Sequence, residues 1–525
     1  MYFLGITSYL HMLVKTFGSA VYGVDAITIS VEVDVNNQGK HYFIVGLPDN
    51  AIKESLQRVE SAIKSNHFYM PRTKLVVNLA PADIKKTGTA FDLSIAIGTL
   101  AATGQIDNAE RLKAFVIMGE LSLDGTIKPI KGALSIALQA KKEKFEGLIV
   151  PLSNAKEAAM VNGLKVFGVN HMKDVVDFFK NEHTLTETIV NTGETFLKAQ
   201  SKYDIDFGDV KGQQNIKRAL EIAAAGGHNA ILIGPPGAGK TMLAKRIPTI
   251  LPPLSLQEAL ETTKIHSVAG KLPEDLTIVN KRPFRSPHHT ISDVALVGGG
   301  GNPQPGEISL AHNGVLFLDE LPEFKRTVLE VMRQPMEERK VTISRAKVAL
   351  DFPASFMLIA SMNPCPCGYF NHPEKDCSCA PGVVQKYLNK VSGPLLDRID
   401  LHVEVTPVNF DELASIQQSE KSDAIRQRVM ESRTIQEKRY LKYEAVYCNA
   451  QMSSKMLKEI CVIDEPSKKL LKTVMERLSL SARAYDRILK VSRTIADLSF
   501  SQHIKSEHLA EAIQFRSLDR ENWGS

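Results

Sequence analysis

Gly234-Pro-Pro-Gly-Ala-Gly-Lys-Thr241 is the stretch that decides the fold of this chain. It fits the phosphate-loop pattern GxxxxGK[ST] and follows the apolar run 230–233, which predicts a buried strand. Its glycines let backbone N–H groups converge on phosphate oxygens, Lys240 reaches the β- and γ-phosphates, and Thr241 offers its hydroxyl to Mg²⁺. The predicted nucleotide-binding residues are Gly234, Pro235, Pro236, Gly237, Ala238, Gly239, Lys240 and Thr241.

A second apolar strand, Val315-Leu-Phe-Leu-Asp-Glu320, ends in two acids. A nucleotide hydrolase needs one carboxylate to hold the metal and another to polarise the attacking water. Asp319 is the predicted Mg²⁺ residue and Glu320 the predicted catalytic residue. A chance glycine-rich turn does not account for both segments, so the sequence predicts that ATP is bound and hydrolysed.

The whole chain sets broader limits. Its 525 residues exceed what one hydrophobic core supports, so about three domains are expected. The formal net charge of +5 permits a polyanionic partner without requiring one. No apolar run is long enough to span a bilayer, and the N-terminus lacks the basic leader of a secretory signal, which predicts a cytoplasmic protein without a membrane partner.

Hydrophobic periodicity divides the chain into a multidomain α/β protein. Residues 1–11 are interpreted as a possible upstream extension before Met12, and 12–180 as an independent α+β domain that includes the alternating strand 27–35. A polar linker follows at 181–206. The core that carries the phosphate loop is predicted at 207–407, and a mostly helical C-terminal domain at 408–525.

Further segments of the core suit nucleotide hydrolysis. Phe207–Gln213 precedes the phosphate loop, where it could grip the base. Ile359–Asn363 is an apolar strand whose terminal amide could orient water beside the γ-phosphate. Arg398 could reach the nucleotide of a neighbouring subunit and neutralise charge that develops during phosphoryl transfer, and Arg483 opens a later helix. Ordinary surface ion pairs are the alternative for both arginines.

These motifs resemble the magnesium-chelatase-like group of AAA+ ATPases, and specifically the YifB/ComM family of competence-associated proteins. The resemblance rests on Arg282–Thr290, Gly298–Gly301, Pro305–His312, Val315–Phe324 and Asn363–Gly368. It implies that Asn363 is sensor 1, Arg398 a trans-acting arginine finger and Arg483 sensor 2. It also implies a homo-hexameric ring and a C-terminal helical lid.

The run Lys340–Leu350 alternates like a hairpin. In related helicases the corresponding hairpin touches DNA backbone, so Arg345 and Lys347 are candidates for sequence-independent phosphate contacts. A solvated hairpin tip with two cations is the alternative. His288 and His289 line the pore, line an interface, or form hydrogen bonds in the core, and the sequence does not choose among these roles.

Cys365, Cys367, Cys377 and Cys379 form two CxC pairs inside an insertion at 365–379. Four thiolates brought together by a short loop can enclose a tetrahedral Zn²⁺ with no open position, so a structural zinc is predicted. Free or redox-active thiols are the alternative.

The N-terminal domain resembles the proteolytic domain of Lon through Lys85–Leu93 and Met118–Leu134. Lon requires a serine nucleophile and a lysine base, and Ala90 and Leu134 occupy those positions here. The domain is therefore predicted not to be a protease. Thr87, Thr89, Lys131 and Ser135 lie nearby, and residual activity through a one-residue alignment slip that restores a hydroxyl is the alternative.

These observations and the family resemblance favour an ATP-driven ring motor on DNA, a helicase that performs branch migration during natural transformation. A chelatase-like or general protein-remodelling ATPase is the main rival, and an ATP-gated scaffold without turnover is another. Fold alone does not separate them.

Overall fold

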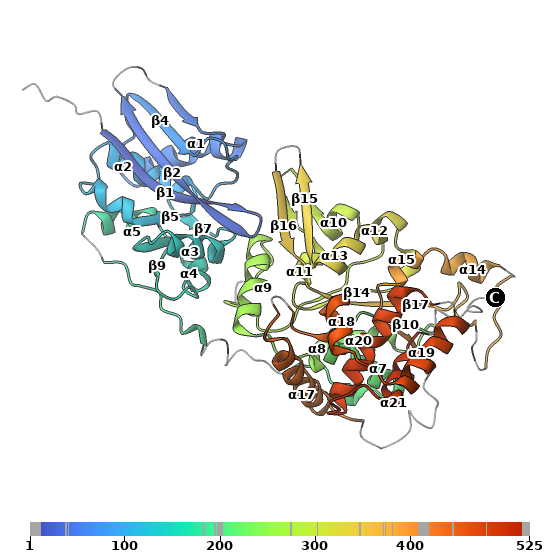
Figure 1. The fold of residues 1–525 in the computed structure, drawn as a ribbon. Coiled ribbons are helices and arrows are strands. Elements are labelled where there is room, and N and C mark those ends of the chain that lie inside the picture. The colour runs from blue at the N-terminus through green and yellow to red at the C-terminus, as the bar shows by residue number, and fades with distance from the viewer. Residues whose placement is uncertain are drawn as a thin grey trace, which may run out of the picture. The chain divides into compact units, whose positions relative to one another are not determined.

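The computed structural model describes residues 12–516 except 37–38, 40, 182–183, 194–195, 197–202, 274–275, 302, 346–347, 371, 373, 381, 408–418, 444–445 and 479. The predicted extension at 1–11 lies outside the described residues. The chain forms two compact units (Figure 1). The first unit comprises Met1–Ala199, Ala259–Val279 and Gly301–Gln304, and the second comprises Gln200–Glu258, Asn280–Gly300 and Pro305–Ser525.

The first unit is built on a seven-stranded mixed sheet with the order β3-β4-β2-β1-β5-β8-β9. Strand β2 pairs antiparallel with both β1 and β4, whereas the remaining pairs in this sheet are parallel. The strands are β1 (Met12–Tyr22), β2 (Asp25–Asn36), β3 (Tyr42–Val45), β4 (Lys74–Ala80), β5 (Phe115–Ile117), β8 (Gly147–Pro151) and β9 (Lys165–Val169), with a small hairpin of β6 (Glu120–Leu121) and β7 (Ile127–Lys128).

Helices complete this unit, and its sequence pattern explains most of them. In α1 (Asn50–Ser65), the apolar residues at helical spacing are the buried ones. By contrast, α2 (Asp92–Ala102) is buried on every side, so it shows no amphipathic period and was not predicted from the sequence. The other elements are α3 (Ala133–Lys142), α4 (Leu152–Ala158), α5 (Met172–Phe179), the 3₁₀ turn η1 (Ala109–Ala114) and most of α9 (Leu256–Val268).

The second unit contains a five-stranded parallel sheet with the order β11-β14-β17-β10-β18. Its three central strands, β14, β17 and β10, are fully buried and almost entirely apolar because a parallel sheet is covered on both faces. The five strands are β10 (Ala230–Ile233), β11 (Phe284–Arg285), β14 (Val315–Leu318), β17 (Met357–Met362) and β18 (Leu401–Glu404).

Helices and a hairpin surround this sheet, in agreement with the predicted AAA+ α/β core. The helices are α7 (Gln214–Gly226), α8 (Lys240–Ile250), α10 (Asp293–Val297), α11 (Glu307–Leu310), α12 (Arg326–Val331), α13 (Arg333–Glu338), α14 (Val383–Leu388) and α15 (Gly393–Leu396). The antiparallel hairpin is β15 (Lys340–Arg345) and β16 (Val348–Pro353), and the short strands are β12 (Gly298–Gly299) and β13 (Gln304–Pro305). The 3₁₀ turns are η2 (Phe207–Asp209) and η3 (Leu321–Glu323).

The C-terminal part is helical, as predicted, and shares one hydrophobic core with the parallel sheet. Buried Ile488 and Leu509 belong to the same cluster as Leu232 and Phe317. The elements are α17 (Ser422–Tyr440), η4 (Asn449–Gln451), α18 (Ser454–Ile460), α19 (Glu465–Arg477), α20 (Ala482–Leu498) and α21 (Ser506–Gln514). Within the described part of the chain, none of the helices combines the length and hydrophobicity needed to cross a bilayer.

Candidate ATP-hydrolysis site

Three neighbouring strands of the second unit bring the predicted chemistry to one edge of the sheet. Strands β14, β17 and β10 lie side by side, and Asp319, Asn363 and Gly234 each follow the end of one strand. The ends of β10 and β17 are joined directly, since the Gly234 N–H donates to the Met362 carbonyl at 3.2 Å. Because the carboxyl ends of parallel strands meet at one edge, residues distant in sequence converge there.

The phosphate loop turns back over this edge. Gly237 and Gly239 adopt left-handed backbone conformations with φ of 79° and 84°, which glycine reaches at low cost. The Lys240 ammonium donates to the Gly234 carbonyl at 2.6 Å, the Pro235 carbonyl at 2.9 Å and Asn363 Oδ1 at 3.0 Å. Burial lowers the pKa of Lys240, and the charges of Asp319 and Glu320 partly offset this effect.

Thr241 and Asp319, the two predicted Mg²⁺ residues, lie in contact with each other. The Thr241 hydroxyl donates to Asp319 Oδ2 at 2.7 Å, and the Ser361 hydroxyl donates to the other carboxylate oxygen. Hydroxyl and carboxylate oxygens are hard ligands, and Mg²⁺ bound with a nucleotide takes few protein ligands. These side chains therefore fit a Mg²⁺ ion that is shared with phosphate oxygens.

Glu320 follows at the start of η3, in a left-handed conformation with φ of 54°. Its carboxylate lies 3.4 Å from His289 Nδ1. Glu320 and Asn363 both line a cavity of about 400 Å³, together with Tyr387 of α14. Burial raises the pKa of Tyr387 to about 12, so its hydroxyl stays neutral beside the two predicted catalytic residues.

The predicted finger Arg398 lies at the amino ends of the parallel strands, opposite the carboxyl ends that carry the phosphate loop. Its carbonyl accepts from the Asn229 side chain at 3.3 Å, and Asn229 immediately precedes β10. The guanidinium is nearly buried and pairs with Glu337 at 2.7 Å. Burial lowers the pKa of Arg398, Glu337 opposes that shift, and the nearby charges of Arg483 and Arg333 add to it. The charges of Arg483 and Arg333 therefore act on Arg398, and we refer to these three residues as the arginine cluster.

The segment predicted to grip the base supports the phosphate loop through Gln213. The Gln213 side-chain amide donates to the Ala238 carbonyl at 3.0 Å and to the Thr406 carbonyl at 3.1 Å. Phe207, at the other end of the segment, is fully buried in the hydrophobic core. Gln213 therefore ties the loop to the residues that follow β18.

The predicted DNA-contacting hairpin is present as β15 and β16, with Arg345 paired to Val348 across its tip. Lys347 lies outside the described residues, and so does the side chain of Arg345. Their contact with DNA therefore stays a prediction.

The four cysteines of the insertion lie together, and no disulfide joins any two of them. Their sulfur atoms all lie within 4.8 Å of one another. Cys365 Sγ is 3.2 Å from Cys367 Sγ and 3.7 Å from Cys377 Sγ, while Cys367 and Cys377 are 3.5 Å apart. A tetrahedral zinc with bonds of about 2.3 Å sets its ligand sulfurs about 3.8 Å apart, so this donor set fits Zn²⁺.

The cysteine loop also contacts the phosphate loop directly. Gly368 has φ of 85°, and a β-carbon placed there would lie 2.5 Å from Pro236 Cδ. The loop begins two residues after Asn363, and Pro366 lines the same cavity as Glu320. The cysteine cluster therefore supports the catalytic edge from one side.

Thr89 and Lys131, two residues that could have replaced the Lon serine and lysine, contact different partners in the first unit. Thr89 donates its hydroxyl to Glu120, whereas the Lys131 side chain lies against Gly270. Leu134, at the position of the Lon lysine, is fully buried at the start of α3.

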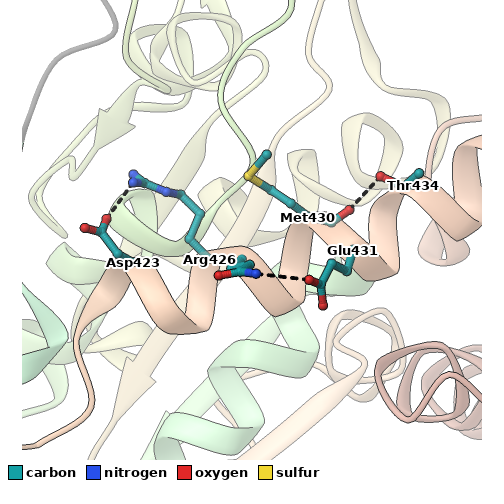
Figure 2. Close-up of a pocket in the computed structure, with 6 residues that line it drawn as sticks. Asp423, Arg426, Met430, Glu431 and Thr434 are labelled. Carbon is teal, nitrogen blue, oxygen red and sulfur yellow. Dashed lines mark hydrogen bonds and ion pairs between the residues drawn. The ribbon is translucent and has the colours of Figure 1, made fainter.

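A second hollow, of about 390 Å³, lies along α17 and is unrelated to the catalytic edge (Figure 2). Its polar side chains satisfy one another along the same helix: Arg426 pairs with Asp423 at 2.6 Å, and Gln427 donates to Glu431 at 3.2 Å. This pattern is that of a solvated helix face rather than of a binding site.

The phosphate loop, the Asp-Glu strand and the sensor asparagine on adjacent parallel strands define a P-loop ATPase of the AAA+ class. Comparison with known families agrees. Residues 206–413 match magnesium chelatase, subunit ChlI, residues 31–154 match subunit ChlI of Mg-chelatase, and residues 419–516 match its C-terminal region.

Individual relatives narrow the class. The competence protein ComM of Haemophilus influenzae is 43% identical over 97% of this chain and 98% of its own length. The protein YifB of Escherichia coli is 42% identical, with 95% and 96% covered. Lon protease 2 of Bacillus subtilis is 32% identical over 27% of this chain and 26% of its own. The chain belongs to the ComM/YifB family of magnesium-chelatase-like AAA+ ATPases.

Several residues of the site were not predicted from the sequence. Ser361 and Gly368 lie in segments that the sequence singles out, but neither they nor Tyr387 were given a role, and only the fold brings them to the catalytic edge. His289 was singled out without a role, and the structure places it against Glu320. Its position after β11, the strand that pairs with β14, is the signal that could have indicated this contact.

The contact between the two loops can be tested with a Gly368→Ala variant. The added methyl group displaces Pro236, and overpacking of this kind costs about 1–3 kcal/mol. We expect ATP affinity to fall about tenfold, which corresponds to about 1.4 kcal/mol. Gly382→Ala is the matched control, because Gly382 has a similar φ of 78° and a β-carbon there meets nothing within 4 Å. Equal affinities of the two variants for a fluorescent ATP analogue would contradict the proposed support.

Proposed function

We propose that the protein is an ATP-hydrolysing ring motor that acts on DNA, as a helicase that drives branch migration when transforming DNA is integrated. The single observation that carries the ring is the position of Arg398. The phosphate loop follows the carboxyl end of β10. The Arg398 carbonyl instead accepts a hydrogen bond from Asn229, the residue just before the amino end of β10. Four strand residues separate these edges by about 13 Å.

An arginine at the amino end of the strands is better placed to reach the nucleotide of a neighbouring copy than the nucleotide of its own chain. Arg398 and Arg483 share one cluster, so both could approach the phosphates bound by a neighbour. Positive charge delivered in this way acts on the charge that develops in the transition state. A homo-hexamer is the closed arrangement that we propose.

Each residue at the catalytic edge has a role in this proposal. Lys240 exchanges its carbonyl partners for the β- and γ-phosphates, and Thr241 and Asp319 hold Mg²⁺. Glu320 accepts the proton of the attacking water, while Asn363 orients that water. Mg²⁺, when bound, neutralises charge on the phosphate oxygens.

The nucleic-acid partner is supported by two lines of argument. One is the hairpin β15–β16, whose tip carries Arg345 and Lys347 in sequence. The other is that a full-length relative is named a competence protein. A cationic hairpin tip suits single-stranded or branched DNA through sequence-independent phosphate contacts.

Protein remodelling is the second candidate, because the chelatase families match both the ATPase and the C-terminal regions. Under either function we propose a cytoplasmic protein whose N-terminal unit is not a protease, since alanine and leucine replace the Lon dyad.

We also propose that the four insertion cysteines hold one structural Zn²⁺ ion.

The DNA motor is tested by ATP turnover with and without single-stranded and branched DNA. We expect DNA to raise kcat several-fold, and Glu320→Gln to abolish turnover while ATP binding is retained, because the base alone is lost. Hairpin variants Arg345→Ala and Lys347→Ala should reduce the DNA response more than basal turnover.

Turnover that ignores DNA would overturn the DNA motor but leave the ATPase intact. Stimulation by a protein partner would then favour remodelling. Tight ATP binding without turnover in the unmodified chain would instead favour a scaffold.

The zinc proposal is tested by metal analysis of purified protein. We expect about one equivalent of zinc, with Cys367→Ser and Cys377→Ser each losing most of it because one of four ligands is removed. Cys448→Ser is the control, since Cys448 is buried outside the cluster. Less than about a tenth of an equivalent, with all four thiols freely titratable, would contradict the site.

A further inference from the structure

One segment of the ATPase sequence folds with the N-terminal unit. Residues Ala259–Val279 belong to the first compact unit, although they lie inside the region 206–413 that matches the chelatase family. Most of α9 falls in this segment (Figure 1). The contacts within the first unit show what the segment does there.

A buried polar network joins α9 to the start of α3. The Ser267 hydroxyl donates to Glu157 Oε1 at 2.5 Å and accepts from the Gly132 N–H at 3.0 Å. The same Glu157 oxygen accepts from the Leu134 N–H at 2.8 Å. Glu157 is only 7% exposed, and burial raises its pKa. A buried carboxyl group of this kind is costly unless hydrogen bonds satisfy it, and Ser267 supplies one of them.

Close packing surrounds this network. Gly132 has φ of 74°, and a β-carbon there would lie 2.7 Å from Val21 Cγ2 and 3.5 Å from Val268 Cγ2. The Lys131 side chain lies as closely against Gly270, with Cε 2.7 Å from the corresponding position. One turn before Val268 in the same helix, Lys264 pairs with Asp25 at 2.7 Å.

This contact covers a specific part of the Lon-like surface. Leu134 stands where Lon has its catalytic lysine, and Lys131 and Gly132 lie three and two positions before it. The helix that contacts them comes from another part of the same chain, so this face already has an occupant.

We propose that residues 259–279 are a docking arm of the ATPase, and that the N-terminal unit binds this arm at the start of α3, beside the position at which Lon has its catalytic lysine. In this proposal the N-terminal unit is an accessory domain attached to the ATPase, and this face does not bind peptide substrates. The proposal does not depend on DNA being the substrate.

The ends of the arm are anchored in the second unit. The Arg282 guanidinium pairs with Glu258 at 3.2 Å and donates to the Asn313 carbonyl at 2.7 Å. Glu258 precedes the arm, and Asn313 lies two residues before β14, the strand that leads to Asp319.

The test severs the covalent link and asks whether the arm holds. A protease recognition sequence is inserted between Ala199 and Gln200, and the full chain is cleaved under native conditions without nucleotide. We expect the two fragments to co-elute in size-exclusion chromatography. Ser267→Glu, which sets a second carboxylate beside Glu157, should weaken their association at least about a hundredfold.

Leu256→Glu is the matched control, because it adds the same charge at an exposed position of the same helix, and its fragments should co-elute. Val268→Asp is a second disrupting variant, in case Ser267→Glu fails to fold. Circular dichroism confirms that separated fragments remain folded. Separation of the unmodified fragments, or co-elution of folded Ser267→Glu and Val268→Asp fragments, would overturn the proposal.

Discussion

The hydrogen bond from Lys240 to Asn363 is the contact on which the rest of the catalytic arrangement depends. It joins the phosphate loop to the end of β17, just as the bond from Thr241 to Asp319 joins the loop to the end of β14. Both bonds require the three strands to be parallel and adjacent. The order β14-β17-β10 therefore turns sequence motifs more than a hundred residues apart into one site.

The two edges of this sheet have different tasks. The carboxyl edge holds the nucleotide residues and is supported by the cysteine loop through Gly368. The amino edge holds Arg398, and Asp400 beside it pairs with Arg487 of α20 at 3.0 Å, one turn after Arg483. That ion pair holds the helix of Arg483 against the turn that carries Arg398 and leads into β18. In the ring that we propose, the nucleotide residues of one chain would face the arginines of its neighbour.

Much of the fold could be predicted from sequence, because its signals are local. The alternation of residues 27–35 predicted β2, and the phosphate-loop pattern predicted β10 followed by α8. Helix α2 could not be predicted because burial on all sides removes its period. The contacts of His289 and Tyr387 with the catalytic edge depend on strand order, which a single sequence does not display.

The placement of residues 259–279 was also beyond sequence reasoning. These residues lie between two motifs of the ATPase, so sequence assigns them to the core at 207–407, whereas the structure groups them with the first unit. The reason is long-range: Ser267 completes the hydrogen bonding of Glu157, 110 positions away. A hydrogen bond between a buried carboxyl group and a distant hydroxyl produces no hydrophobic periodicity in either segment, so the sequence pattern does not reveal it.

The central claim, a site completed by a second copy, is tested most directly by mixing two inactive variants. Lys240→Ala removes nucleotide contacts in its own chain, and Arg398→Ala removes the cation proposed to act on a neighbour. The account predicts that each variant alone is inactive and that their mixture regains ATP turnover, because some interfaces pair an intact phosphate loop with an intact Arg398. A mixture that stays inactive although the two chains co-assemble would contradict it, as would full turnover by Arg398→Ala alone.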